Sequence, residues 1–244
     1  MQTQRQLDTP RHLHGVRVAI TGGTSGLGLA LVRELTRRGA QVALIARTQS
    51  RVAAVAAEES AHGIAGDVAN KLDIHRIALQ VTGRLGGLDV LINNASDLGP
   101  VPLALLGDTE CEDFERALDT NVLGPFRLTK ALLGSLAASA REGTGALVLN
   151  ISSDAAVSAY PQWGAYGASK AALAHMTRIW NEELSAQGVR FIALDPGDMA
   201  TPMHAAALPD ADPATLKPPA QAAHELAEAI CDLLSAHPAL RYAS

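Results

Sequence analysis

The sequence has little cysteine, few aromatic residues and little charge. Its 244 residues include two cysteines, 3% aromatic residues and 18% charged residues, and the formal net charge is −5 with histidine neutral. Two thiols, Cys111 and Cys231, cannot build a disulfide framework, so we expect a reducing, cytoplasmic location with both thiols packed as small hydrophobic groups. The mildly acidic balance argues against a protein that binds nucleic acid or an anionic membrane surface.

Long hydrophobic runs are also missing. No apolar stretch approaches the roughly 18 residues of a membrane span. Residues 1–14 are polar and lack the apolar core of a secretory signal, so we expect a flexible leader there. No linker rich in proline, glycine and serine divides the rest of the chain. Because 48% of the residues are apolar, residues 15–244 can bury a sizeable core, and we expect them to form one domain.

Short apolar runs alternate with longer segments of helical spacing. The expected strands are residues 16–20, 42–46, 64–66, 88–92, 146–151 and 189–194, with a short edge strand at 240–243. The expected helices are residues 27–38, 74–81, 112–140 with an interruption at Gly124-Pro125, 165–186 and 221–235. Strands that are apolar throughout indicate parallel β-α-β units covered on both faces. The sequence therefore predicts an α/β fold, a single doubly wound Rossmann-type domain with a central parallel sheet flanked by helices.

A glycine-rich segment, Thr21–Gly28, follows the first expected strand and opens the first expected helix. Glycine lets the backbone turn sharply and approach a pyrophosphate, whose negative charge is favoured at a helix N-terminus. A tight turn without a ligand uses the same glycines, so the pattern alone does not decide between the two. Its place at the first strand-to-helix junction predicts dinucleotide binding.

The end of the second strand bears on which dinucleotide is bound. An NAD site places a carboxylate there to accept hydrogen bonds from the ribose hydroxyls, whereas this chain has Ala46 followed by Arg47. A guanidinium pairs well with a 2′-phosphate, and no neighbouring acid repels that phosphate. A solvated arginine after a strand is the alternative interpretation. The missing acid favours NADP(H) over NAD(H).

Polar residues also follow the third and fourth strands. Asp67, followed by Val68, is placed to accept a hydrogen bond from an adenine amino group, and Asn93-Asn94-Ala95 borders the expected groove. Buried asparagines must be hydrogen-bonded, so this pair can equally tie neighbouring strands together. We expect one role of each kind.

Tyr166 and Lys170 are four residues apart in an expected helix and therefore share one face. The pKa of a free phenol is about 10, which makes it a poor base at neutral pH. A neighbouring ammonium and an oxidised nicotinamide both favour the phenolate and lower that pKa. The phenol then protonates a carbonyl oxygen as hydride arrives, or takes the proton back in oxidation. An ordinary pair on a helix surface has the same spacing, so the surrounding residues must decide.

Two further residues support the chemical interpretation. Ser153 follows the fifth strand, where its hydroxyl can hold a substrate oxygen. Asn121 precedes Gly124-Pro125, which should disturb the hydrogen bonds of the helix, so that the Asn121 side chain can order a water.

Taken together, these motifs resemble the short-chain dehydrogenase/reductase family in its short single-domain branch. Between residues 15 and 201 the chain carries Thr21-Gly22-x-x-x-Gly26-x-Gly28, Asn93-Asn94-Ala95, Asn121, Ser153, Tyr166-x-x-x-Lys170 and Pro196-Gly197 in the family's order. The resemblance implies a catalytic tetrad in which Tyr166 is the acid/base and Ser153 polarises the carbonyl. It further implies that Lys170 also binds the nicotinamide ribose, that Asn121 supports a proton-relay water, and that Arg47 occupies a position typical of NADP-preferring members.

The predicted cofactor contacts follow from these motifs, and no metal site is expected. They are Gly22, Thr24, Ser25, Gly26, Leu27, Gly28, Arg47, Asp67, Val68, Asn94, Ala95, Tyr166, Lys170, Pro196, Met199 and Thr201, the last three implied by the resemblance to border the nicotinamide.

The chain departs from the family pattern at three places. Ser96 replaces the glycine that usually follows Asn-Asn-Ala, and Ser25 stands in the glycine loop where many NADP-preferring members carry a basic residue. The C-terminus lacks the glycine-rich motif of many members. These departures bear on cofactor preference and on the assembly surface.

The substrate end is expected in residues 198–219, a long loop with apolar side chains, which favours a hydrophobic or mixed carbonyl compound. Tyr160 and Trp163 either wall the pocket or cap the entry of the helix. Asp154 either binds a polar substrate group or is a solvated loop acid. His204 either contacts the substrate or is an exposed loop residue, and we expect the second.

The sequence predicts an NADP(H)-dependent oxidoreductase that interconverts a ketone or aldehyde and an alcohol. A non-catalytic NADP-binding sensor is the alternative, and a nucleotide-sugar epimerase shares the tyrosine and lysine chemistry but differs in glycine spacing. The resemblance also implies a homodimer or homotetramer that pairs through residues 112–140 and 165–186.

Overall fold

The computed structural model describes residues 12–235 and places six parallel strands in one sheet. The strands are β1 (Arg17–Thr21), β2 (Gln41–Ala46), β3 (His62–Ala65), β4 (Val90–Asn93), β5 (Ala146–Ile151) and β6 (Val189–Leu194). Their order across the sheet is β3-β2-β1-β4-β5-β6, and every neighbouring pair is parallel. The chain runs outward from β1 in both directions, so a crevice opens at the carboxyl ends of β1 and β4, where such sheets bind ligands.

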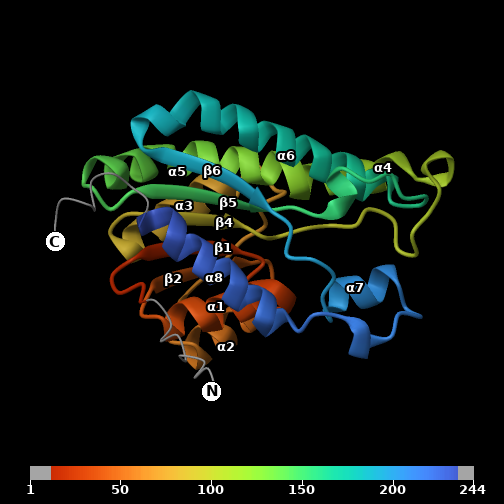
Figure 1. Ribbon diagram of the computed structural model, residues 1–244, viewed down its shortest axis with the longest axis horizontal. Helices are drawn as coiled ribbons and strands as arrows, with labels where there is room; N and C mark the ends of the chain where they lie inside the picture. Colours follow the sequence, from red (N-terminus) through yellow and green to blue (C-terminus); the bar gives the residue numbers. More distant parts are fainter. Residues whose placement is uncertain (1–11, 236–244) are drawn as a thin grey trace, which may run out of the picture.

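Helices cover both faces of the sheet (Figure 1). One face carries α1 (Gly26–Arg37), α2 (Gln49–Glu58) and α8 (Pro219–Ser235), and the other carries α3 (Ile74–Leu85), α5 (Gly124–Arg141) and α6 (Gly164–Leu184). The shorter helices α4 (Cys111–Leu118) and α7 (Pro202–Ala207) lie toward the carboxyl end of the sheet. Each face has its own apolar core, and the central strands are buried on both sides. The predicted doubly wound α/β fold is therefore confirmed.

Helix α2 is an element that sequence reasoning missed. Its ten residues are rich in alanine, and only Val52 and Val55 are buried against the sheet. Two buried apolar residues give a weak periodic signal, so the helix owes its stability to packing on β2 and β3. The consequence for function is that Arg51 lies on the first turn of this helix, three residues after the N-cap residue Thr48.

The expected helix over residues 112–140 is divided in three. Between α4 and α5 the segment Asp119–Leu123 forms a π-helical turn. Pro125 has no N–H to donate to the carbonyl four residues earlier, which is that of Asn121, and the ladder widens at this point. The predicted disturbance lies just before Gly124-Pro125 and places Asn121 at its centre.

The expected loop over residues 198–219 contains regular structure. It includes α7 and a 3₁₀ turn, Pro213–Thr215, and α8 begins at Pro219 instead of the expected residue 221. Met199 and Lys217 form a parallel bridge that closes the base of this segment. Proline opens both α7 and α8, where its missing N–H costs nothing.

Two predictions concern the ends of the chain, a leader over residues 1–14 and a strand over residues 240–243. Leu13, within the expected leader, is buried and its N–H donates to the carbonyl of Arg38. The expected strand at 240–243 lies outside the described residues.

The two thiols differ in exposure. Cys231 is buried as expected, but Cys111 is exposed because it opens α4 on a face turned to solvent. Among residues 12–235, no helix has both the length and the apolar character needed to span a membrane.

A chain of buried polar side chains links strands β4 and β5 to α6. The amide nitrogen of Asn93 on β4 donates to the side-chain oxygen of Asn150 on β5 at 2.8 Å, and the Asn150 amide nitrogen donates to the hydroxyl of Thr177 at 2.8 Å. All three side chains are buried, so none can exchange its partner for water. This chain fixes β5 against α6 just below the functional residues described next.

We expect Asn150→Ala to lower the free energy of unfolding by about 1–3 kcal/mol, because it removes a buried partner from both Asn93 and Thr177. Urea unfolding measures this change. Gln41→Ala, at an exposed position, is the control and should stay within about 0.5 kcal/mol of the native protein. Equal stability of the Asn150 variant and the control would contradict a structural role for the chain.

Candidate active site

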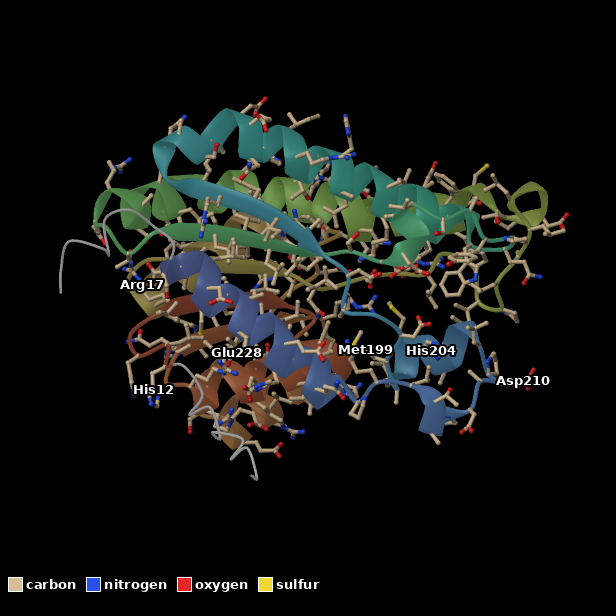
Figure 2. All side chains as sticks on the ribbon, in the orientation of Figure 1. His12, Arg17, Met199, His204, Asp210 and Glu228 are labelled. Carbon is tan, nitrogen blue, oxygen red and sulfur yellow. The ribbon has the colours of Figure 1, made fainter. Side chains whose placement is uncertain are left out.

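A cavity of about 830 Å³ lies at the carboxyl ends of the strands. Figure 2 shows Met199 and His204 at this end of the molecule, with Arg17, at the start of β1, at the other. All sixteen predicted cofactor residues line the cavity, as does Ser153. Asn121, the remaining predicted tetrad residue, lies behind the wall and is buried.

The glycine loop forms one end of the cavity because its backbone has no room for side chains. Gly22 and Gly26 have positive φ angles of 70° and 51°. A Cβ on Gly28 would meet the carbonyl oxygen of Gly22 and would lie 2.6 Å from the amide nitrogen of Asn94. The loop therefore keeps its backbone close to the cavity, as a pyrophosphate requires.

The two adjacent asparagines after β4 have different positions. Asn93 is part of the buried chain between strands and does not line the cavity. Asn94 lines it, and its amide nitrogen donates to the carbonyl of Thr21 at 2.8 Å, which ties β4 to the start of the glycine loop. One residue thus joins strands while the other shapes the cavity wall.

Basic residues gather at the end of the cavity beside β2. Arg47 and Arg51 both line it, and Thr48 between them is the N-cap of α2. Neither guanidinium forms an ion pair with a carboxylate anywhere in residues 12–235. Sequence reasoning missed Arg51, because its position became meaningful only once α2 was recognised. The spacing of Val52 and Val55 was the available signal.

Asp67 lies on the same side of the cavity, beyond Gly66 at the end of β3. One carboxylate oxygen accepts the backbone N–H of Ala69 at 3.0 Å. The carboxylate thus remains at the cavity wall where the sequence predicts an adenine contact.

Tyr166 and Lys170 both point from α6 into the cavity and are both buried. The Lys170 Nζ donates to the backbone carbonyl of Ile151, at the end of β5, at 2.8 Å. The same nitrogen lies 5.5 Å from the centre of the Tyr166 ring. Trp163 packs edge-on against that ring with 5.6 Å between centres. The helix and the strand end thus hold an ammonium beside a phenol.

Burial dominates the ionisation of both groups in the protein alone. It raises the pKa of Tyr166 to about 12, while the hydroxyls of Ser153 and Ser96 act in the opposite direction. Burial lowers the pKa of Lys170 to about 8, and the negative charge of Asp195 opposes that change. Lys170 therefore remains mainly protonated at neutral pH, and the phenol keeps its proton.

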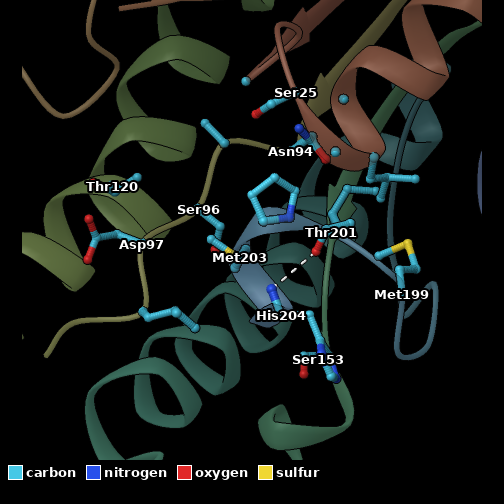
Figure 3. A pocket seen from close by; sticks show the side chains of 18 of the residues that line it. Ser25, Asn94, Ser96, Asp97, Thr120, Ser153, Met199, Thr201, Met203 and His204 are labelled. Carbon is cyan, nitrogen blue, oxygen red and sulfur yellow. Dashed lines mark hydrogen bonds between the residues drawn. The ribbon is translucent and has the colours of Figure 1, made fainter. Parts of the chain in front are cut away.

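Ser153 stands at the opposite end of the cavity from Ser25 and Asn94 (Figure 3). Its hydroxyl donates to a carboxylate oxygen of Asp154 at 3.1 Å and accepts the N–H of Ala155 at 3.2 Å. Met203 and His204 of α7 complete this part of the wall, and His204 is half-buried and not exposed as expected. Tyr160 and Trp163 both line the cavity, as the first of their two expected roles requires, whereas Trp163 occupies the N-cap position of α6 without a capping hydrogen bond from its side chain.

Asn121 acts on the cavity through its neighbours. Its amide oxygen accepts from the N–H of Asp97 at 2.8 Å and from the Ser96 hydroxyl at 3.1 Å. Its amide nitrogen donates to the Asp97 carbonyl and to the Ser169 hydroxyl, both at 2.8 Å. Protein groups thus use both N–H groups and two acceptor sites of the amide. The residue fixes the segment of Ser96 and Asp97 instead of reaching into the cavity.

The buried ammonium predicts a pH dependence of stability. Below about pH 8 the folded and unfolded chains both carry the Lys170 proton, and the folded chain bears the cost of burying the charge. Between about 8 and 10.5 the folded chain releases the proton first, so stability rises with pH. Relative to Lys170→Met, the native protein should gain about 2 kcal/mol in unfolding free energy from pH 7 to about pH 10. Parallel pH dependences of the two proteins would contradict the burial of a charged lysine.

Comparison with known proteins identifies relatives along most of the chain. A family model described as short chain dehydrogenase matches residues 17–212. Momilactone A synthase of Oryza sativa subsp. japonica is 33% identical over 201 residues, which are 81% of this chain and 72% of that protein.

Solved structures share the fold over nearly the whole chain. A short chain dehydrogenase from Shigella flexneri 2a, solved with NADP, has a TM-score of 0.81 at 25% identity and covers 93% of this chain and 92% of its own. A 3-ketoacyl-(acyl-carrier-protein) reductase from Brucella melitensis, solved with NADH, has a TM-score of 0.82 at 26% identity, with 93% and 94% covered. On the family match and the curated relative, the chain belongs to the short-chain dehydrogenase/reductase family of nicotinamide-dependent oxidoreductases.

Proposed function

We propose that the protein interconverts a carbonyl compound and an alcohol with NADP(H), and that Tyr166 is the acid/base. The observation that carries the proposal is the convergence of Tyr166, Lys170 and Ser153 on one cavity whose other end is the glycine loop. The phenol of Tyr166 can donate a proton, and the ammonium of Lys170 favours the phenolate that remains. The hydroxyl of Ser153 can form a hydrogen bond with a substrate oxygen.

The cavity suits a nicotinamide dinucleotide. The glycine loop brings its backbone to the cavity wall, where a Cβ at Gly28 would clash with the Gly22 carbonyl oxygen, and it opens α1, whose N-terminus favours a pyrophosphate. Arg47 and Arg51 lie at the β2 end, where an adenosine ribose would carry its 2′-phosphate. Tyr166, Lys170, Pro196, Met199 and Thr201 would border the nicotinamide. When bound, the reduced nicotinamide supplies a hydride to the carbonyl carbon.

In the proposed mechanism Tyr166 donates its phenolic proton to the substrate oxygen during reduction. The phenolate that remains lies beside the Lys170 ammonium, whose charge favours it in this buried site. Ser153 holds the substrate oxygen within reach of the phenol. The same groups act in reverse during oxidation, when Tyr166 accepts the proton of the alcohol.

We assign Asn121 a positioning role. Its four hydrogen bonds fix Ser96, Asp97 and Ser169, and Ser169 in turn donates to the carbonyl of Tyr166 at 2.7 Å. The cavity wall on this side and the turn of α6 that carries the phenol are therefore set by one amide. We also propose that the chain forms a homodimer or homotetramer through α4, α5 and α6, where Ile179 of α6 is exposed.

Tyr166→Phe tests the acid/base assignment. The variant should lower kcat by about 100-fold or more for any carbonyl that the native protein reduces, because the proton donor is lost. NADPH affinity, measured by its fluorescence in the complex, should change less than about threefold, since the ring remains in place. Native turnover in the variant would contradict the assignment. Native binding of NADPH without turnover of any carbonyl or alcohol would instead favour the sensor.

Removing the two arginines tests the cofactor preference. Arg47→Gln and Arg51→Gln should each weaken NADPH binding by about 10-fold, because a charged hydrogen bond to the 2′-phosphate is lost. Binding of NADH, which lacks that phosphate, should remain within about twofold. Tighter binding of NADH than of NADPH to the native protein would contradict the proposed preference for NADP(H). Equal losses of affinity for the two cofactors in the variants would contradict the role of the two arginines.

A further inference from the structure

Asp154 is placed where it interferes with the proposed role of Ser153. The Ser153 hydroxyl donates to one carboxylate oxygen of Asp154 at 3.1 Å, and the Tyr160 hydroxyl donates to the other at 2.7 Å. All three side chains line the cavity. Ser153 has a single hydroxyl proton, so a hydroxyl that donates to Asp154 cannot at the same time donate to a substrate oxygen.

The carboxylate keeps its charge in this setting. Hydrogen bonds from Tyr160, then from Ser153 and the backbone, lower the pKa of Asp154. No lysine, arginine or histidine forms an ion pair with it within residues 12–235. A strong acceptor thus holds the Ser153 proton away from the position of the substrate oxygen.

Other carboxylates line the end of the cavity that contains Ser153 and Asp154. Asp195 and Asp198 also line the cavity and are exposed, whereas the two cavity arginines lie at the β2 end. Lys170 is the one lysine or arginine near Ser153 among the described lining residues; it is buried, and one of its three N–H groups is bonded to the Ile151 carbonyl. The other titratable side chains of the lining away from the β2 end are those of Asp97, Tyr160, Tyr166 and His204. A substrate carboxylate or phosphate beside Asp154 would meet a carboxylate that no lysine, arginine or histidine of residues 12–235 pairs with.

We propose that Asp154 selects substrates that carry a hydrogen-bond donor on the carbon next to the carbonyl, a hydroxyl or an ammonium, and rejects those that carry an anion there. The donor of the substrate replaces the Ser153 hydroxyl on Asp154, and the freed hydroxyl turns to the substrate oxygen. Each group then keeps a partner, whereas a substrate without a donor leaves either Asp154 or its own oxygen with one bond fewer. This inference rests on the proposed function of the same cavity.

Three ketones that share a phenyl group test the selection. 2-Hydroxyacetophenone has the donor, propiophenone has a methyl group in the same place, and benzoylformate has a carboxylate. The apolar wall of Trp163, Met203 and Leu208 suits the common ring. With saturating NADPH, kcat/KM should fall in that order, and benzoylformate should be at least about 10-fold below propiophenone.

Variants separate selection from the intrinsic reactivity of the ketones. In Asp154→Ala the ratio of kcat/KM for the hydroxyketone over propiophenone should fall about 10-fold from its native value, since only the donor-bearing substrate loses a partner. Asp154→Asn removes the charge and should raise kcat/KM for benzoylformate. Asp210→Asn removes a similar exposed charge outside the cavity and should leave every ratio unchanged. A purely structural role of Asp154 would lower all three substrates together, which would overturn the proposal.

A binding arm distinguishes failure of this inference from failure of the proposed function. Calorimetric titration of the protein saturated with NADP⁺ compares 1-phenyl-1,2-ethanediol with 1-phenyl-1-propanol, and the diol should bind about 10-fold more tightly to the native protein but not to Asp154→Ala. Equal binding of the two alcohols to the native protein, or no binding of the diol, overturns the selection by Asp154. Failure of NADP⁺ itself to bind, seen in a separate titration, overturns the proposed function.

Discussion

A buried ammonium organises the carboxyl end of the sheet. The Lys170 Nζ has almost no exposure to solvent, and its hydrogen bond to Ile151 joins α6 to the last residue of β5. That bond places Tyr166 one helical turn before it, beside the cavity, and it brings the end of β5 to the point where Ser153 begins the next turn. The cost of burying the charge is visible in the lowered pKa of Lys170, and the same charge favours the phenolate that proton transfer requires.

The two ends of the cavity carry charged side chains of opposite sign. Arg47 and Arg51 stand at the β2 end, the ammonium stands in the middle, and Asp154 stands with other carboxylates at the substrate end. A ligand with phosphates at one end and a neutral or donor-bearing group at the other matches this order. The exposed carboxylates are screened by solvent and contribute little to stability, and the role we propose for Asp154 is in the choice among substrates.

The sequence predicts the parts of the site that depend on local spacing. The glycine loop and the pair of Tyr166 and Lys170 follow from local spacing, and the doubly wound sheet follows from the alternation of strands and helices along the chain. The structure places the glycine loop and the pair in one cavity. Arg51 could not be found in the same way, because its helix is held by packing on β2 and β3 and has only two buried apolar residues. The Asn121 side-chain amide forms its hydrogen bonds with Ser96, Asp97 and Ser169, which lie in other segments of the chain. The hydrogen bond from Ser153 to Asp154 depends on the rotation of the two side chains. Neither set of hydrogen bonds could be predicted from the spacing of residues or from a sequence motif.

The central claim is that this cavity transfers hydride to a carbonyl carbon while Tyr166 protonates its oxygen. NADPH labelled with deuterium at C4 tests it most directly, by mass spectrometry of the alcohols formed from a panel of carbonyl compounds. With the native protein, one deuterium should reach the carbinol carbon from NADPH labelled on one face of C4 and none from NADPH labelled on the other face. This transfer should fall about 100-fold or more in Tyr166→Phe. Tight binding of labelled NADPH with no deuterium in any alcohol would contradict the central claim.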